Sequence, residues 1–155
     1  MAKVAYKEGD FIAVPLREGG WAAGRIARVG SGGILLGYFL GQQYDDEPTI
    51  ASVLRFKSDD AVLIAMFGDL GLLNGSWKVI GASAFKKSEW PVPKFCRRDV
   101  VSGKSYLVTY DVSDVSKEID LKPISIERGV PEDGLFGYGA IELVLTKRLA
   151  AAQNR

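Results

Sequence analysis

The segment Asp10–Leu40 reads DFIAVPLREGGWAAGRIARVGSGGILLGYFL, in which runs of apolar and small residues alternate with glycine pairs. The runs at 10–16, 21–29 and 34–40 have the length and composition of strands. The intervening Gly-Gly pairs adopt positive φ at little cost and favour tight turns. Gly24, inside the second run, indicates a β-bulge or the close approach of another segment. This stretch therefore predicts a curled, barrel-like meander of strands.

Further strands are predicted beyond this meander, because short apolar runs between turn residues continue along the chain. Asn74-Gly75 is a strong turn signal. The residues around Pro123, at 119–121 and 124–126, alternate in polarity, and the proline indicates an edge strand or a break. The further predicted strands are 62–67, 77–81 and 105–110.

A helix is predicted only near the C-terminus, over residues 137–150. The residues at helical spacing are Tyr138, Ile141, Leu145 and Leu149. We therefore expect an α+β fold, with a mostly antiparallel, curled sheet and a C-terminal helix packed on it. No repeat or shift in composition divides the chain, so residues 1–155 are expected to form a single domain.

The composition is that of an ordinary globular protein. Of the 155 residues, 47% are hydrophobic and 25% are charged, which suits a core that needs no disulfide or metal. The net charge of +1 argues against the broad basic face that tight, non-specific nucleic-acid binding requires. Neither a signal peptide nor a membrane-spanning stretch is recognised, and Cys96 is the single cysteine. We expect a bacterial, cytoplasmic protein with no membrane partner.

The histidine count of zero is the strongest restriction on function. It removes the usual general base, proton shuttle and metal ligand, and with them the Ser-His-Asp and Cys-His mechanisms. A tetrahedral zinc site has too few ligands in a chain with a single cysteine. We therefore expect a protein that binds another macromolecule and is not an enzyme, with no catalytic residue, metal or cofactor.

Asp45, Asp46 and Glu47 form a compact acidic cluster in the polar region 41–60. A loop between strands exposes its side chains, so these three residues are expected to bind a partner. Carboxylates also ligate hard cations, but this run lacks the spaced oxygen ligands of an EF-hand loop. The cluster therefore predicts a contact with a basic partner surface.

The three tryptophans could stack on nucleic-acid bases, but their neighbours favour other roles. Trp21 and Trp77 lie in or beside apolar runs and are expected in the core. Trp90 precedes Pro91 in a segment that two prolines keep extended, and such segments often lie on a surface. We therefore add Trp90 to the expected partner-binding residues.

Charge is distributed unevenly in the second half of the chain. Residues 86–104 carry a net +4 from six basic and two acidic residues, and residues 111–133 carry a net −4 from seven acidic and three basic residues. These segments are either solvated loops whose charges cancel or surfaces that steer a charged partner.

Motifs scattered over most of the chain share the pattern of a known family. The opening combines Gly9-Asp10, an apolar strand that ends in Pro15-Leu16, an aromatic residue and Gly24-Arg25. The central motifs are Gly75-Ser76-Trp77-Lys78-Val79-Ile80-Gly81 and Trp90-Pro91-Val92-Pro93, and the closing motif is Gly137-Tyr138-Gly139-Ala140-Ile141-Glu142. Together they resemble the immunity protein 26 family of bacterial polymorphic-toxin systems, although residues 41–74 carry no signature of it.

This resemblance implies a protein that binds a cognate toxin in the cytosol and neutralises it stoichiometrically, and it implies no catalytic residues. Two other interpretations remain open. One is a small β-barrel that binds nucleic acid in a groove formed by Arg25, Arg28 and the basic segment 86–104. The other is a nuclease of the toxin–antitoxin type with an arginine-plus-carboxylate site.

Overall fold

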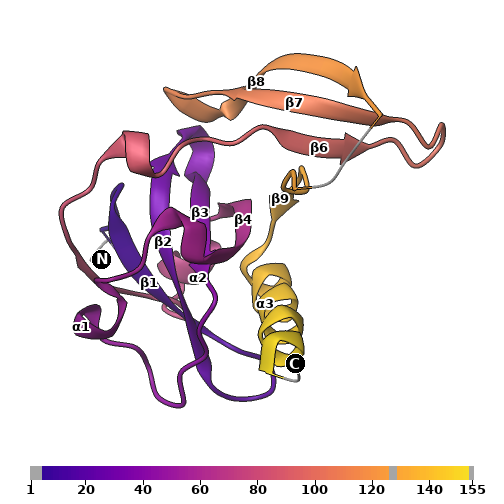
Figure 1. Ribbon diagram of the computed structural model, residues 1–155. Coiled ribbons are helices and arrows are strands. Elements are labelled where there is room, and N and C mark those ends of the chain that lie inside the picture. The colour runs from indigo at the N-terminus through magenta and orange to yellow at the C-terminus, as the bar shows by residue number, and fades with distance from the viewer. Residues whose placement is uncertain (1–4, 126–128, 154–155) are drawn as a thin grey trace.

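The first three strands form the meander that the sequence predicts. In the computed structural model, which describes residues 5–125 and 129–153, β1 (Asp10–Pro15), β2 (Trp21–Val29) and β3 (Ile34–Leu40) pair antiparallel in chain order (Figure 1). Glycines 19, 20, 32 and 33 all have positive φ. The predicted role of the glycine pairs in these turns is confirmed.

The meander is part of a six-stranded sheet with the order β5-β1-β2-β3-β4-β9. β4 (Ala61–Gly68) and β5 (Lys78–Ala82) match predicted strands. β4 pairs antiparallel with β3, and β5 pairs antiparallel with β1. The short β9 (Leu135–Phe136), which was not predicted, adds to β4 in parallel. Among the described strands, β5 and β9 remain the two edges, so the curled sheet does not close into a barrel.

A second antiparallel sheet has the order β6-β7-β8 and lies across one end of the larger sheet (Figure 1). It consists of β6 (Phe95–Arg98), β7 (Ser105–Asp111) and β8 (Asp114–Ile124). β7 matches a predicted strand, whereas β6 was not predicted. Pro123 lies in the edge strand β8, as the sequence indicated, and Ile126 lies outside the described residues.

The long C-terminal helix is confirmed as α3 (Tyr138–Gln153). The other helices, α1 (Ile50–Val53) and α2 (Leu70–Leu73), are single turns in connecting segments. Short 3₁₀ turns occupy residues 31–33, 58–60 and 87–89.

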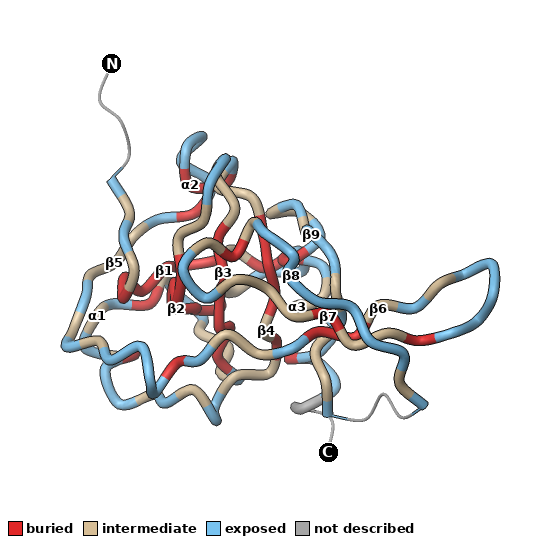
Figure 2. Tube along the Cα trace, turned by 90° about the horizontal axis from the view of Figure 1, so that it is seen from above, coloured by how far each residue is buried: buried red, intermediate tan, exposed pale blue. Residues whose placement is uncertain are grey.

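The core lies on both faces of the larger sheet, and its buried residues concentrate in the central strands (Figure 2). On one face, Ile141 and Leu145 of α3 are fully buried against the sheet, which confirms the expected packing of the helix. On the other face, Phe95 and Val108 of the small sheet pack against Leu36 of β3.

Gly24 shows the close approach that the sequence indicated. A Cβ atom at this position would lie 2.8 Å from Cδ1 of Phe39 on the neighbouring strand. The β-bulge falls slightly later, between Ile26 and Arg28.

Trp77 occupies the centre of the core on the α3 side and is 1% exposed. Its ring centroid lies 5.9 Å from that of Phe39 and 5.4 Å from that of Phe67. The indole N–H donates a 2.9 Å hydrogen bond to Oε2 of Glu142 on α3. The predicted core position of Trp77 is confirmed, whereas Trp21 is only half-buried.

Replacing Trp77 with alanine is expected to lower the free energy of unfolding by about 3–5 kcal/mol, because it opens a cavity and removes the donor to Glu142. Urea denaturation followed by circular dichroism measures this change. Trp21→Ala is the matched control and should cost clearly less. Equal losses in the two variants would contradict the central position of Trp77.

Candidate functional site

The acidic cluster lies in a loop that is attached to the larger sheet at Tyr44. Tyr44 and Trp21 exchange two backbone hydrogen bonds of 2.7 and 2.8 Å, which form an isolated antiparallel bridge. Pro48, just after the cluster, is buried. The loop 45–47 is therefore held at both ends.

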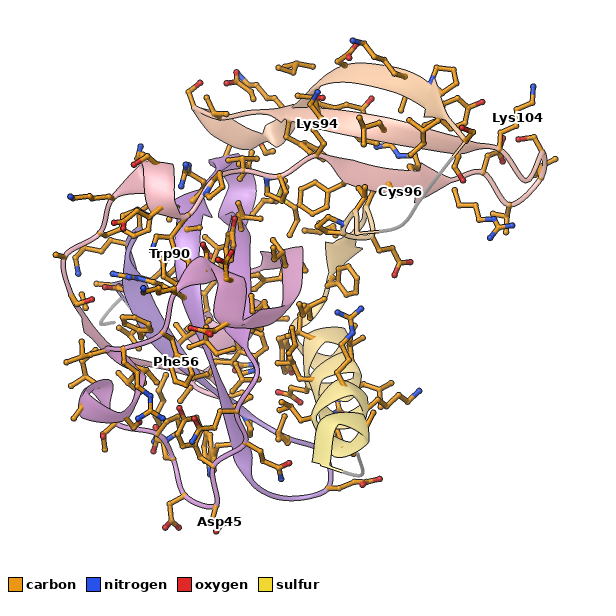
Figure 3. The ribbon with its side chains drawn as sticks, in the orientation of Figure 1. Asp45, Phe56, Trp90, Lys94, Cys96 and Lys104 are labelled. Atoms are coloured by element: carbon orange, nitrogen blue, oxygen red, sulfur yellow. The ribbon has the colours of Figure 1, made fainter. Side chains whose placement is uncertain are left out.

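The three carboxylates of the loop differ in their surroundings. Asp45 and Asp46 are exposed, whereas Glu47 is half-buried, and its Oε2 lies 3.7 Å from Nζ of Lys78 on β5. Asp45 points away from the body of the molecule, at the end opposite the small sheet (Figure 3). The exposed negative charge of the loop is thus carried mainly by Asp45 and Asp46.

Trp90 does not lie beside this loop (Figure 3), and it is buried. Its side chain is 4% exposed, and its ring meets that of Tyr38 edge-on with centroids 5.2 Å apart. The expected surface position of Trp90 is therefore wrong. Ser88 and Glu89, which were predicted to be extended, lie in the 3₁₀ turn 87–89, and the indole of Trp90 packs in the core.

Arg25 attaches the segment that joins the two sheets, residues 83–94, which we call the inter-sheet linker. Arg25 is 4% exposed on β2. Its Nη2 atom donates 3.2 Å hydrogen bonds to the carbonyl oxygens of Ser83 and Ala84, and its Nε atom donates a 3.0 Å bond to that of Gly9. One guanidinium thus holds two separate segments against the strand.

Aromatic rings surround the same guanidinium. Its central carbon lies 4.4 Å from the ring centroid of Phe11, 5.1 Å from that of Phe85 and 5.0 Å from that of Trp90. Burial lowers the pKa of Arg25, and the negative charges of Glu89 and Asp10 oppose this shift. Ring faces carry negative potential, so they stabilise the buried cation together with the carbonyl groups.

Arg28, on the same strand, binds a later part of the linker and is 6% exposed. Its Nη1 atom donates a 3.0 Å hydrogen bond to the carbonyl oxygen of Trp90, and Nη2 donates a 3.4 Å bond to that of Lys87. The nucleic-acid groove that the sequence suggested for Arg25 and Arg28 is therefore wrong. Both guanidiniums are buried against backbone and do not face solvent.

The uneven charges of the second half partly cancel inside the small sheet. Nε of Arg97 on β6 donates a 2.8 Å hydrogen bond to Asp133, and Nη2 pairs with Glu118 on β8. Tyr110 of β7 donates to the other oxygen of Asp133. Burial and Asp133 raise the pKa of Tyr110 to about 12. Cancellation was one of the two interpretations of these segments; Glu127 and Arg128 lie outside the described residues.

This Arg97 cluster borders a hollow of about 300 Å³ between the two sheets. It is the kind of arginine-plus-carboxylate arrangement that the nuclease interpretation requires. Both carboxylates of the cluster, those of Glu118 and Asp133, are paired with Arg97. The cluster therefore connects β6, β8 and the segment before β9 through ion pairs. The opposite charges of the two sequence segments were the signal that could have identified it.

The described residues form neither a metal-binding cluster nor a membrane-spanning helix. Within residues 5–125 and 129–153, no group of three His, Cys, Asp or Glu side chains is placed to hold a metal ion. In the same part of the chain, no helix is both long and apolar enough to cross a membrane.

The fold and these contacts define the class of protein: it is a small α+β protein in which two packed sheets carry charged, exposed loops. Residues 7–107 match the family model of Immunity protein 26, and the chain belongs to this family. The resemblance noted in the sequence is thus confirmed, and the match includes residues 41–74, where no signature was recognised. The closing motif at 137–142 lies outside the matched residues. Comparisons with curated proteins and with solved structures find no match.

Replacing Arg25 with lysine is expected to lower the free energy of unfolding by about 2–4 kcal/mol, because an ammonium keeps the charge but cannot bond all the carbonyls. Arg55→Lys is the matched control, since Arg55 is exposed, and it should change stability by less than about 0.5 kcal/mol. Chemical denaturation measures both values. Faster amide hydrogen exchange in the linker should accompany the loss in Arg25→Lys, and unchanged stability would rule out the proposed attachment.

Stability should fall as the pH rises from about 10 to 12, because unfolded tyrosines ionise near pH 10 whereas Tyr110 in the fold has a pKa of about 12. The contribution of Tyr110 is fully present below pH 10 and is lost as the pH approaches 12. The Tyr110→Phe variant should therefore lose stability less steeply over this range. Denaturation curves at several alkaline pH values test this, and identical slopes for both proteins would argue against it.

Proposed function

We propose that this protein neutralises a bacterial toxin in the cytosol by binding it stoichiometrically. The observation that carries the proposal is membership of the Immunity protein 26 family, which implies an immunity role and, in general terms, a toxin as the partner. The single cysteine is compatible with a reducing compartment. In this proposal the protein acts as an inhibitor that is consumed one molecule per toxin molecule, without turnover.

The acidic loop 45–47 is the surface that we propose for the contact. Asp45 and Asp46 are exposed, and the bridge between Tyr44 and Trp21 fixes the start of the loop. A loop held in this way loses little conformational entropy on binding. Enzymes that act on nucleic acids usually present a basic cleft, and carboxylates that enter such a cleft replace the phosphate charge. Complementary charge then speeds association, and buried pairs slow release.

Replacing Asp45, Asp46 and Glu47 with alanine is expected to weaken inhibition at least about tenfold, or about 1.4 kcal/mol. The measurement is a titration of a purified candidate toxin domain, with thermal unfolding as the control for folding. The fold should persist, because two of the three side chains are exposed and the third makes one surface ion pair.

A charge-matched variant separates the site from the net charge. Replacing Asp59, Asp120 and Glu132, which are exposed elsewhere, removes the same charge and should leave inhibition nearly unchanged. Equal inhibition by wild type and the loop variant would eliminate the loop as the interface. Substoichiometric destruction of the toxin would eliminate the binding mechanism itself.

A further inference from the structure

The turn between β6 and β7 exposes two neighbouring valines almost completely. Val100 is 95% exposed and Val101 is 96% exposed, whereas the next most exposed large apolar side chain of the described residues, Val112, is 66% exposed. The turn extends well beyond the rest of the small sheet (Figure 2). Valine is uncommon in turns, where glycine, proline, asparagine, aspartate and serine predominate. Because the two side chains are almost fully exposed, they contribute little to the stability of the fold, and a contact with a partner would explain their presence.

The turn keeps its shape without the valine side chains. The Asp99 N–H donates to Lys104 O, and the Gly103 N–H donates to Asp99 O, both at 2.8 Å. The carboxylate of Asp99 accepts a 3.0 Å bond from the Val101 N–H and a 2.9 Å bond from the Ser102 hydroxyl. These bonds hold the pKa of Asp99 below its usual range. Val100 and Val101 thus extend from a turn that is already ordered.

Basic side chains flank the two valines. Arg98 ends β6 and Lys104 precedes β7, and both are exposed. Lys104 points into solvent near the far end of the hairpin (Figure 3). The negative charge of Asp99 is directed into the turn by its hydrogen bonds. The tip of the hairpin, residues 98–104, therefore presents an apolar centre with positive charge at its base.

We propose that residues 98–104 form a second docking element, which inserts Val100 and Val101 into an apolar hollow with acidic side chains at its rim on the toxin. This inference rests on the proposed function, because it names the toxin as the partner. The charge of the hairpin is opposite to that of the acidic loop, and the two lie at different ends of the molecule (Figure 3). They therefore contact different parts of the toxin. An ordered turn that buries two β-branched side chains gains apolar contact with little loss of entropy.

The test replaces both valines with serine and titrates the same purified candidate toxin domain. Val100→Ser/Val101→Ser should weaken inhibition at least about tenfold without lowering the thermal unfolding temperature, because neither side chain packs against the fold. The matched control is Val112→Ser, in the turn at the other end of the same sheet, which should inhibit like wild type. A benzophenone side chain introduced at position 100 should crosslink to the toxin, whereas one at position 112 should not.

The acidic rim has its own test. Arg98→Glu/Lys104→Glu should lower the association rate, with the difference from wild type shrinking as salt increases. Equal rates for this variant and wild type would remove the acidic rim from the proposal.

Three outcomes would overturn the proposal, and they are distinguishable. If wild-type protein fails to inhibit the toxin, the proposed function fails and the named partner with it. If wild type inhibits and the double-serine variant inhibits equally, the hairpin is not a contact although the function stands. If the valines are needed for binding to vesicles of anionic phospholipid, or for self-association, their partner is a membrane or a second copy of the chain.

Discussion

Two guanidinium groups on β2 determine how the sheets of this protein are joined. The inter-sheet linker has few backbone partners of its own, and Arg25 and Arg28 donate to its carbonyl groups at residues 83, 84, 87 and 90. The bond to the Trp90 carbonyl is buried and the other three are partly buried, and a buried carbonyl without a donor costs roughly 1–3 kcal/mol. Burial of two cations is itself costly, and carbonyl oxygens and aromatic faces offset that cost. Among the described residues, Nε of Arg28 is the one buried side-chain nitrogen or oxygen atom that has no hydrogen-bond partner.

The position of the small sheet follows from this attachment. Once the linker is fixed on one face of β2, β6 begins over that face, and Phe95 and Val108 reach the core. The ion pairs of Arg97 then hold β8 and the segment before β9 to β6. As a result the acidic loop and the β6–β7 turn lie at opposite ends of the molecule. In each of them the backbone is held by hydrogen bonds that do not involve the exposed side chains of Asp45, Val100 or Val101. The buried charges thus hold the two sheets together, whereas the exposed charges make few contacts within the fold.

The sequence predicts β1 to β5 well, because each is a short apolar run next to turn residues. It does not predict β6, because Phe95-Cys96 is too short a run to stand out, and it indicates only part of β8, through the alternation around Pro123. Two-residue β9 has no pattern of its own and depends on pairing with β4. Arginine is usually exposed, so the nucleic-acid interpretation placed Arg25 and Arg28 in a surface groove, and only the fold places carbonyls and rings around them. Trp90 was misplaced because its proline-rich segment resembles a surface segment, whereas in the fold its ring contacts Arg25 and Tyr38, which are distant in sequence.

The buried arginines and the exposed loops respond differently to substitution. At Arg25 a replacement must satisfy three carbonyls and three rings at once, so almost any change costs stability. At Asp45 or Val100 the side chain is exposed, and most changes there alter stability by less than about 0.5 kcal/mol. Residues 7–107, which match the family model, contain the arginines, the acidic loop and the β6–β7 turn. The same matched segment therefore contains both the buried arginines on which the fold depends and exposed loops whose side chains contribute little to stability.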